Sequence, residues 1–151
     1  MAEPHWKPIV DQKRLTQVLS IPSSWRLPQS TVASDATTLE TIRNCGILSA
    51  KELEWTDIDD ITELLRLLAS REVSSVQLTT AFCKRAAVAQ QMTGCLTEIF
   101  FDRGLERAKF LDEELKRTGR TSGPLHGLPV SVKDRFDVEG LDTTVGMLSR
   151  S

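Results

Sequence analysis

Long apolar runs and a secretory leader are absent from this sequence of 151 residues. No apolar stretch approaches the ~18 residues that a membrane-spanning helix needs. The amino-terminal stretch MAEPHWKPIVDQ has neither the basic start nor the apolar run of a secretory signal. We therefore expect a cytoplasmic protein that does not span a membrane.

Cysteine and histidine are also scarce. The three cysteines, Cys45, Cys83 and Cys95, lie far apart and form no C-x-x-C pair, and the two histidines, His5 and His126, stand in unrelated contexts. An odd number of dispersed cysteines is typical of free thiols in a reducing compartment. The sequence therefore predicts neither a disulfide nor a metal site.

An excess of charge of either sign is missing as well. The formal net charge is −2, which gives no electrostatic reason to expect binding to nucleic acid or to an anionic membrane. The hydrophobic fraction, 40%, is enough for a packed core, and the length fits one domain. These values predict an ordinary folded protein and exclude wholesale disorder.

The first third of the chain has the least regular pattern. Residues 6–20 predict an amphipathic helix, residues 21–38 are rich in proline and hydroxyl side chains and predict a loop, and residues 38–44 predict a short helix. We interpret residues 1–56 as an irregular helical wrap and residues 57–151 as the start of the main domain.

Three helices with clearer patterns follow. Apolar residues recur at helical spacing from Ile58 to Leu68, after a first turn that we expect to be acidic. The second helix begins at Ser74, which forms a capping box with Gln77. The third helix covers residues 102–118, with a charged outer face that predicts a solvated surface. The expected acidic first turn contains Asp57, Asp59 and Asp60.

After these helices the period changes toward that of a strand. In residues 128–136, LPVSVKDRF, apolar and polar side chains alternate, which predicts a strand, and residues 141–147 could form a second short one. Helices followed by a first strand are typical of the beginning of an α/β fold. We expect residues 1–151 to be mostly helical, with one or two strands near the carboxyl-terminal end.

Lys133 lies on the predicted strand, on the same face as Ser131. Two interpretations are open. An exposed lysine would keep an edge strand soluble. A buried lysine would lose its charge readily, because desolvation disfavours the ammonium form, and it could then act as a base near neutral pH.

The stretch GPLHGLPVSVKDRFDVEGLDTTVG, residues 123–146, closely resembles the lysine motif of the amidase signature family. Members of that family typically read G-P-L-H-G-I-P and then K-D, followed by a G-x-x-T-T-x-G segment. The upstream stretches LLASREVSSVQLTTAFCKRAA and CLTEIFFDRGLERAKFLDEELKRTG are similar to the family as well. The resemblance covers residues 57–146, and the sequence of this region is most similar to the acetamidase-like amidases of fungi.

The resemblance implies a hydrolase that converts carboxylic amides to acid and ammonia or amine, on an α/β/α fold and without a metal or organic cofactor. It places Lys133 at the catalytic lysine of a Ser–cis-Ser–Lys triad, as the proton acceptor that acts through a bridging serine. Nearby residues are expected to support the position of Lys133 without contacting the substrate: Asp134, Ser131, Asp142, Thr143 and Thr144.

Three of the nearby residues have competing interpretations. Asp134 could orient the lysine region, but an aspartate at the end of a strand more often forms a turn. Ser131 could pair with Lys133, but the family tolerates other small residues there, so support is expected rather than a nucleophile. His126 stands in a tight loop, where a structural hydrogen bond is expected rather than acid–base catalysis.

In the amidase signature family, a Gly/Ser-rich segment supplies both serines and the oxyanion donors. Residues 1–151 contain no such segment. The sequence therefore predicts an amino-terminal part of an amidase, inactive alone, that would bind a small amide substrate once completed. The alternative is a non-catalytic remnant that acts as an interaction piece or pseudoenzyme. Either could form a homo-oligomer or pair with a full-length relative.

Overall fold

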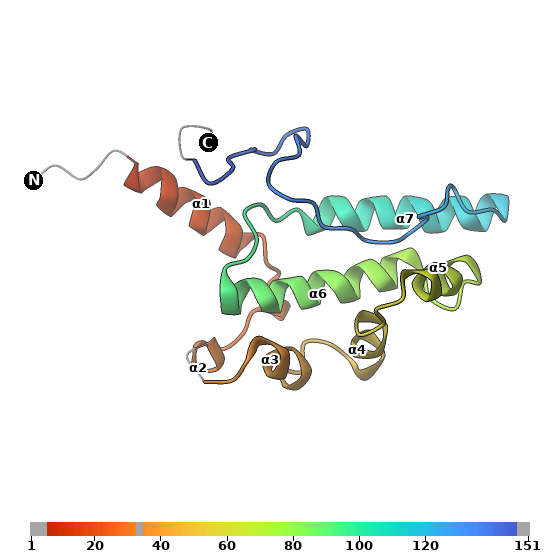
Figure 1. Cartoon of the computed structure of the whole chain (residues 1–151), viewed down its shortest axis with the longest axis horizontal. Coiled ribbons are helices and arrows are strands. Elements are labelled where there is room, and N and C mark those ends of the chain that lie inside the picture. Colours follow the sequence, from red (N-terminus) through yellow and green to blue (C-terminus); the bar gives the residue numbers. More distant parts are fainter. Residues whose placement is uncertain (1–5, 33–34, 148–151) are drawn as a thin grey trace, which may run out of the picture.

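The computed structural model describes residues 6–32 and 35–147, and this part of the chain is helical (Figure 1). Short turns and loops connect the helices. In chain order the elements are α1 (Lys7–Leu19), η1 (Ser23–Trp25), α2 (Gln29–Val32), α3 (Thr38–Asn44), α4 (Ala50–Thr56), α5 (Ile61–Ala69), α6 (Ser75–Thr93) and α7 (Phe101–Thr118). The mostly helical character expected from the sequence is confirmed.

Local capping signals set the starts of several helices. α6 begins after Ser74, whose hydroxyl accepts a hydrogen bond from the Gln77 amide, and the predicted capping box is formed. α4 was not predicted, although Ser49 and Glu52 form the same kind of box at its start. A search for that spacing alone would have found this helix.

α5 begins later than its acidic stretch suggested. Asp60 is the N-cap and accepts a hydrogen bond of 2.8 Å from the Thr62 amide. Asp57 caps the end of α4 instead, and Asp59 lies between the two helices. The expected position of these two acids in the first turn of α5 is therefore wrong. One aspartate therefore satisfies one of the free amide groups at this helix start.

α6 is the central helix of the structure. α7 packs along one side of it, and α3 and α4 pack on the other side (Figure 1). Two groups of buried apolar side chains pack α6 against α5, α4 and α3, one around Leu68 and Leu78 and the other around Ile42 and Val88. The burial of these side chains is the main source of stability for the helical layers.

An aspartate on α7 closes the amino-terminal end of α6. The Asp112 carboxylate accepts hydrogen bonds from the Ser75 amide (2.7 Å) and from the Val76 amide (3.0 Å). These amides have no partner within their own helix, and the helix dipole favours a negative charge at this end. Asp112 therefore fixes α7 against the start of α6. No local sequence pattern predicts this contact.

The strand predicted for residues 128–136 is wrong for the part of the chain that the structure describes. This stretch is irregular, and residues 141–147 contain turns rather than a second strand. Val130 is 72% exposed and Val132 is 53% exposed. A strand needs a neighbouring strand to satisfy its backbone groups, and none of the described residues supplies one.

The boundary predicted between residues 56 and 57 falls at the end of α4. The helices before it are not separate from those after it, since α3 and α4 pack on α6. The division into two parts stays a prediction. Within the described ranges, no helix is both long enough and apolar enough to cross a membrane.

The pair formed by Glu52 and Lys84 joins α4 to α6. The Lys84 ammonium donates to the two carboxylate oxygens at 2.7 Å and 2.9 Å, and the Ser49 amide donates to the same carboxylate at 2.7 Å. Burial opposes ionisation of Glu52, but the hydrogen bonds from Lys84 and Ser49 hold its pKa below the ordinary value of 4.5. The ionised form therefore stabilises the fold.

Replacing Glu52 by glutamine is expected to lower the free energy of unfolding by about 1 kcal/mol at neutral pH, since it weakens a cap and an ion pair. A group with a lowered pKa contributes stability above its unfolded value and loses that contribution as the pH falls through its folded value. The deficit measured by urea unfolding should therefore shrink below pH 4. Glu54→Gln, at an exposed position, is the matched control. If Glu52→Gln lowered the free energy of unfolding equally at neutral pH and below pH 4, the stabilising role of the ionised Glu52 would be contradicted.

Candidate functional site

Lys133 lies in the irregular stretch that follows the loop of residues 121–127, and its side chain is exposed. Its carbonyl oxygen accepts hydrogen bonds from the amides of Arg135 (2.6 Å) and Phe136 (3.2 Å), which form a tight turn directly after it. The described residues 6–32 and 35–147 make no hydrogen bond or ion pair to its amine. They do not form the dry pocket that a lysine base requires.

Residues 126–128, which precede Lys133 in the chain, form a first anchor because they pack against the helices. His126 is 5% exposed, and its Nδ1 accepts a hydrogen bond of 3.1 Å from the Ser122 amide, in agreement with the structural role expected for it. Gly127 has φ +75° and lies against α6, where an added Cβ would come within 2.4 Å of Ser75 Oγ. Leu128 packs on the core that contains Leu68. These contacts fix the start of the lysine segment.

A second anchor follows Lys133. The Asp134 carboxylate accepts hydrogen bonds from the Thr144 hydroxyl (3.0 Å) and the Val145 amide (3.1 Å). Thr143 donates to the Phe136 carbonyl at 3.4 Å. Asp134, Thr143 and Thr144 were predicted to support the site, and the structure brings them together beside Lys133.

Val145, next to this anchor, has a positive φ of 51°. A β-branched residue rarely adopts this conformation, because its side chain crowds the backbone. Strained backbone of this kind persists where surrounding contacts hold it, and it is common at functional sites. The hydrogen bond from the Val145 amide to Asp134 is such a contact.

The other two predicted supporting residues lie differently. Ser131 is exposed, and among the described residues no hydrogen bond joins it to Lys133. Asp142 forms an ion pair with Lys13 of α1, which also bonds to Glu98 at 3.1 Å. The hydrogen bond to Asp142 is the largest cause that raises the pKa of Lys13 above 10.5. Sequence reasoning had assigned no role to Lys13.

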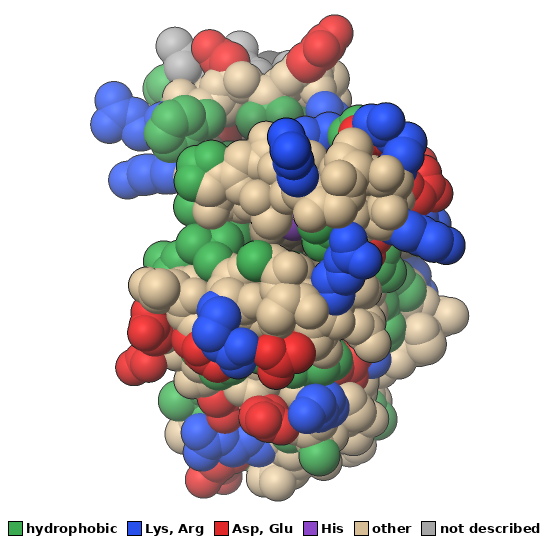
Figure 2. Space-filling model, turned by 90° about the vertical axis from the view of Figure 1, so that its right-hand side faces the viewer, with side chains coloured by type: hydrophobic (Ala, Val, Ile, Leu, Met, Phe, Trp, Pro, Cys, Tyr) green, Lys and Arg blue, Asp and Glu red, His purple; other side chains and the backbone are tan. Residues whose placement is uncertain are grey.

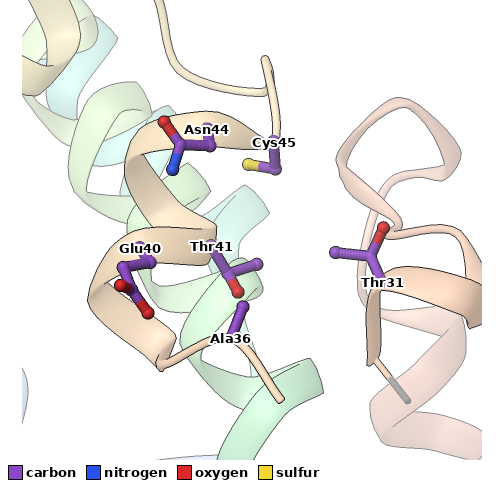
Figure 3. Close-up of a pocket in the computed structure, with 6 residues that line it drawn as sticks. All are labelled: Thr31, Ala36, Glu40, Thr41, Asn44 and Cys45. Carbon is purple, nitrogen blue, oxygen red and sulfur yellow. The ribbon is translucent and has the colours of Figure 1, made fainter. Parts of the chain in front are cut away.

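Two of the cavities between the described residues are lined by other side chains than that of Lys133. One, of about 170 Å³, lies between α2 and α3 and is bordered by Thr41 and Cys45 (Figure 3). The other, of about 330 Å³, lies between α5 and the loop that contains His126. Neither of these two cavities is therefore a substrate pocket at the lysine.

The Cys83 thiol is not suited to nucleophilic catalysis. Burial raises the pKa of the Cys83 thiol to about 11, with a further contribution from Asp102, so this thiol is a poor nucleophile at neutral pH. No three His, Cys, Asp or Glu side chains in the described ranges could hold a metal ion together. On the face seen in Figure 2, acidic and basic side chains are interspersed.

The two anchors thus enclose the segment that carries Lys133, and the first of them holds this segment against α6 and the core. The Amidase family profile matches residues 77–151. The chain belongs to this family of amidase signature proteins, to which the lysine motif had pointed.

Fungal amidases are similar to the chain over nearly all of its length. An amidase of Gibberella moniliformis is 43% identical over 153 residues, which cover 98% of this chain and 29% of that protein. The acetamidase of Emericella nidulans is 40% identical over 144 residues, which cover 95% of this chain and 26% of that protein. The chain therefore spans little more than a quarter of the length of these relatives.

The fold is shared with a solved structure. Fatty acid amide hydrolase matches with a TM-score of 0.85 and 31% identity, over 97% of this chain and 26% of that one. The helical arrangement described above is therefore part of the amidase signature fold. The fold class inferred from the sequence is confirmed, although the described residues contain no strand.

Proposed function

We propose that this chain contributes the general base of an amide-hydrolysing site, and that Lys133 is that base. The observation that carries the proposal is the pair of anchors around Lys133, one at Gly127 and one at Asp134, within a segment that belongs to the amidase family. Anchors on both sides hold the backbone of a residue in place, and catalytic groups require such support.

In the proposed reaction, the neutral Lys133 amine accepts a proton from a bridging serine, which takes the proton of a nucleophilic serine. The nucleophilic oxygen then bonds to the amide carbon, and backbone amides stabilise the oxyanion. The carbon–nitrogen bond breaks as the proton returns through the relay to the leaving nitrogen. Water finally cleaves the acyl-enzyme and releases the carboxylic acid.

The two serines and the oxyanion donors are not supplied by residues 1–151, whose sequence contains no Gly/Ser-rich segment. We therefore propose that amide hydrolysis requires a longer polypeptide, and that small amides are the substrate class. The similarity to an acetamidase supports this substrate class. Loss of even one triad group removes orders of magnitude of rate, so the chain alone should be inactive.

This proposal is tested by comparing two proteins in an ammonia-release assay with acetamide. The first is the chain of residues 1–151 by itself, which should give only the buffer rate. The second is a chimaera in which these residues replace the matching part of the Emericella nidulans acetamidase. The chimaera should hydrolyse acetamide. Hydrolysis by the chain alone that is lost with Lys133→Ala would show that the base does not need the missing groups.

A second function is favoured by the exposed apolar side chains near Lys133. Val130, Val132 and Phe136 are 72%, 53% and 63% exposed, which is typical of surfaces that contact another protein. The chain could then be a non-catalytic piece that pairs with a full-length relative or with itself. Sedimentation of the chain, alone and mixed with the Gibberella moniliformis amidase, distinguishes these states. A monomer in both samples would exclude this function.

A further inference from the structure

α1 is attached to the molecule mainly through polar contacts. None of its residues is buried, and Leu15, Val18 and Leu19 are each more than half exposed. Lys13 instead bonds to Asp142 and to Glu98, and the Gln17 side chain donates to the carbonyls of Leu96 (3.1 Å) and Thr97 (2.8 Å). The helix is therefore held by a few specific partners, whose positions decide where it lies.

One of these partners belongs to the segment that supports Lys133. Asp142 directly precedes Thr143 and Thr144, and Thr144 donates to Asp134. A contact at Asp142 therefore restrains the same stretch of backbone that Asp134 holds from the other side. In Figure 1 the chain after α7 returns along that helix toward α1, which brings residues 129 positions apart into contact.

We propose that Lys13 is a positioning residue of the lysine site, and that α1 acts through it as a strap on residues 142–146. The inference rests on the proposed function of Lys133, but Lys13 itself lies outside the family match at residues 77–151. Lys13 bridges two carboxylates from two separate segments, and such networks contribute more than isolated surface pairs. Without the Lys13 ammonium group, the negative charges of Asp142 and Glu98 would lose the positive charge that they share.

The strap is tested by amide hydrogen exchange in the intact chain of residues 1–151. Three amides in or directly beside residues 142–146 report on this segment, since each donates a hydrogen bond: Leu141 to the Val138 carbonyl, Val145 to the Asp134 carboxylate and Met147 to the Thr144 carbonyl. In Lys13→Met they should exchange roughly threefold faster, the size of effect expected for a partly exposed ion-pair network. Amides of α6 should keep their exchange rates, because the core is untouched.

Three further variants separate the ion pair from a general effect on α1. Arg14→Met removes a neighbouring positive charge that makes no ion pair within the described ranges, and it should leave exchange unchanged. Lys13→Arg should restore protection, and so should the charge exchange Lys13→Glu with Asp142→Lys. Circular dichroism should show the same total helix content in each variant, which excludes a general loss of structure.

The inference is wrong if Lys13→Met leaves the three amides unchanged, or if Arg14→Met accelerates them equally. It is also wrong if neither Lys13→Arg nor the charge exchange restores protection. Exchange does not depend on hydrolysis, so failure of the strap and failure of the proposed activity are separate results. Should Lys13→Met unfold, Asp142→Asn provides the same comparison from the other partner.

Discussion

Replacing Lys133 by alanine in the acetamidase chimaera is expected to lower kcat/KM for acetamide by about a thousandfold or more, the usual cost of losing a group of a nucleophilic triad. The reason is that the serine hydroxyls would then have no proton acceptor. The amine is the one group of the proposed relay that this chain supplies. The measurement is steady-state ammonia release at several acetamide concentrations, so that kcat and KM are separated.

Lys133→Arg distinguishes a base from a positive charge at this position. Arginine keeps its proton at any accessible pH, so it cannot accept one from a serine, and Lys133→Arg should be as damaging as Lys133→Ala. Lys116→Ala, at an exposed position on α7, is the control and should retain full activity. Substantial activity in Lys133→Arg would contradict the role of a proton acceptor.

Replacing Gly127 by alanine is expected to lower the free energy of unfolding by about 2–4 kcal/mol, which combines a strained backbone with overpacking. The φ of +75° disfavours any side chain, and the new Cβ would lie 2.4 Å from Ser75 Oγ and 3.1 Å from Leu68 Cδ2. Ser75 begins α6 and Leu68 is in the core, so neither atom can move freely. Urea unfolding of the 151-residue chain measures the loss.

Gly140→Ala is the matched control for this substitution. Gly140 has a φ of +77°, but no atom lies within 4 Å of the position of its Cβ. The control should therefore show only the backbone cost of about 1–2 kcal/mol. Equal losses in the two variants would mean that Gly127 does not pack against α6 as described.

The helices could largely be predicted from local sequence because their signals are local. Ser74 with Gln77 starts α6, and Gly94 and Gly119, with φ of +62° and +71°, end α6 and α7. The contacts that hold the helices together could not be predicted in the same way. Asp112 lies 37 residues from the Ser75 amide that it caps, and no periodicity links the two.

The lysine site was only partly predictable for a similar reason. The motif predicts Lys133 as the base and Asp134, Thr143 and Thr144 as supporting residues. The structure joins Asp134 to Thr144 and Thr143 to the Phe136 carbonyl, and the supporting role stays a prediction. The strand predicted from the alternation in residues 128–136 depends on a pairing partner, which sequence alternation alone does not supply. The contact between Lys13 and Asp142 spans 129 residues and lies outside any motif.

The central claim is that the Lys133 amine becomes a buried proton acceptor when the rest of an amidase surrounds it. The most direct measurement is the rate at which an amine-acetylating reagent modifies Lys133, followed by mass spectrometry, in the chain alone and in the chimaera. Lys133 should react as fast as the exposed Lys116 in the chain alone, and far more slowly than Lys116 in the active chimaera. Equal modification of the two lysines in the active chimaera would contradict the claim.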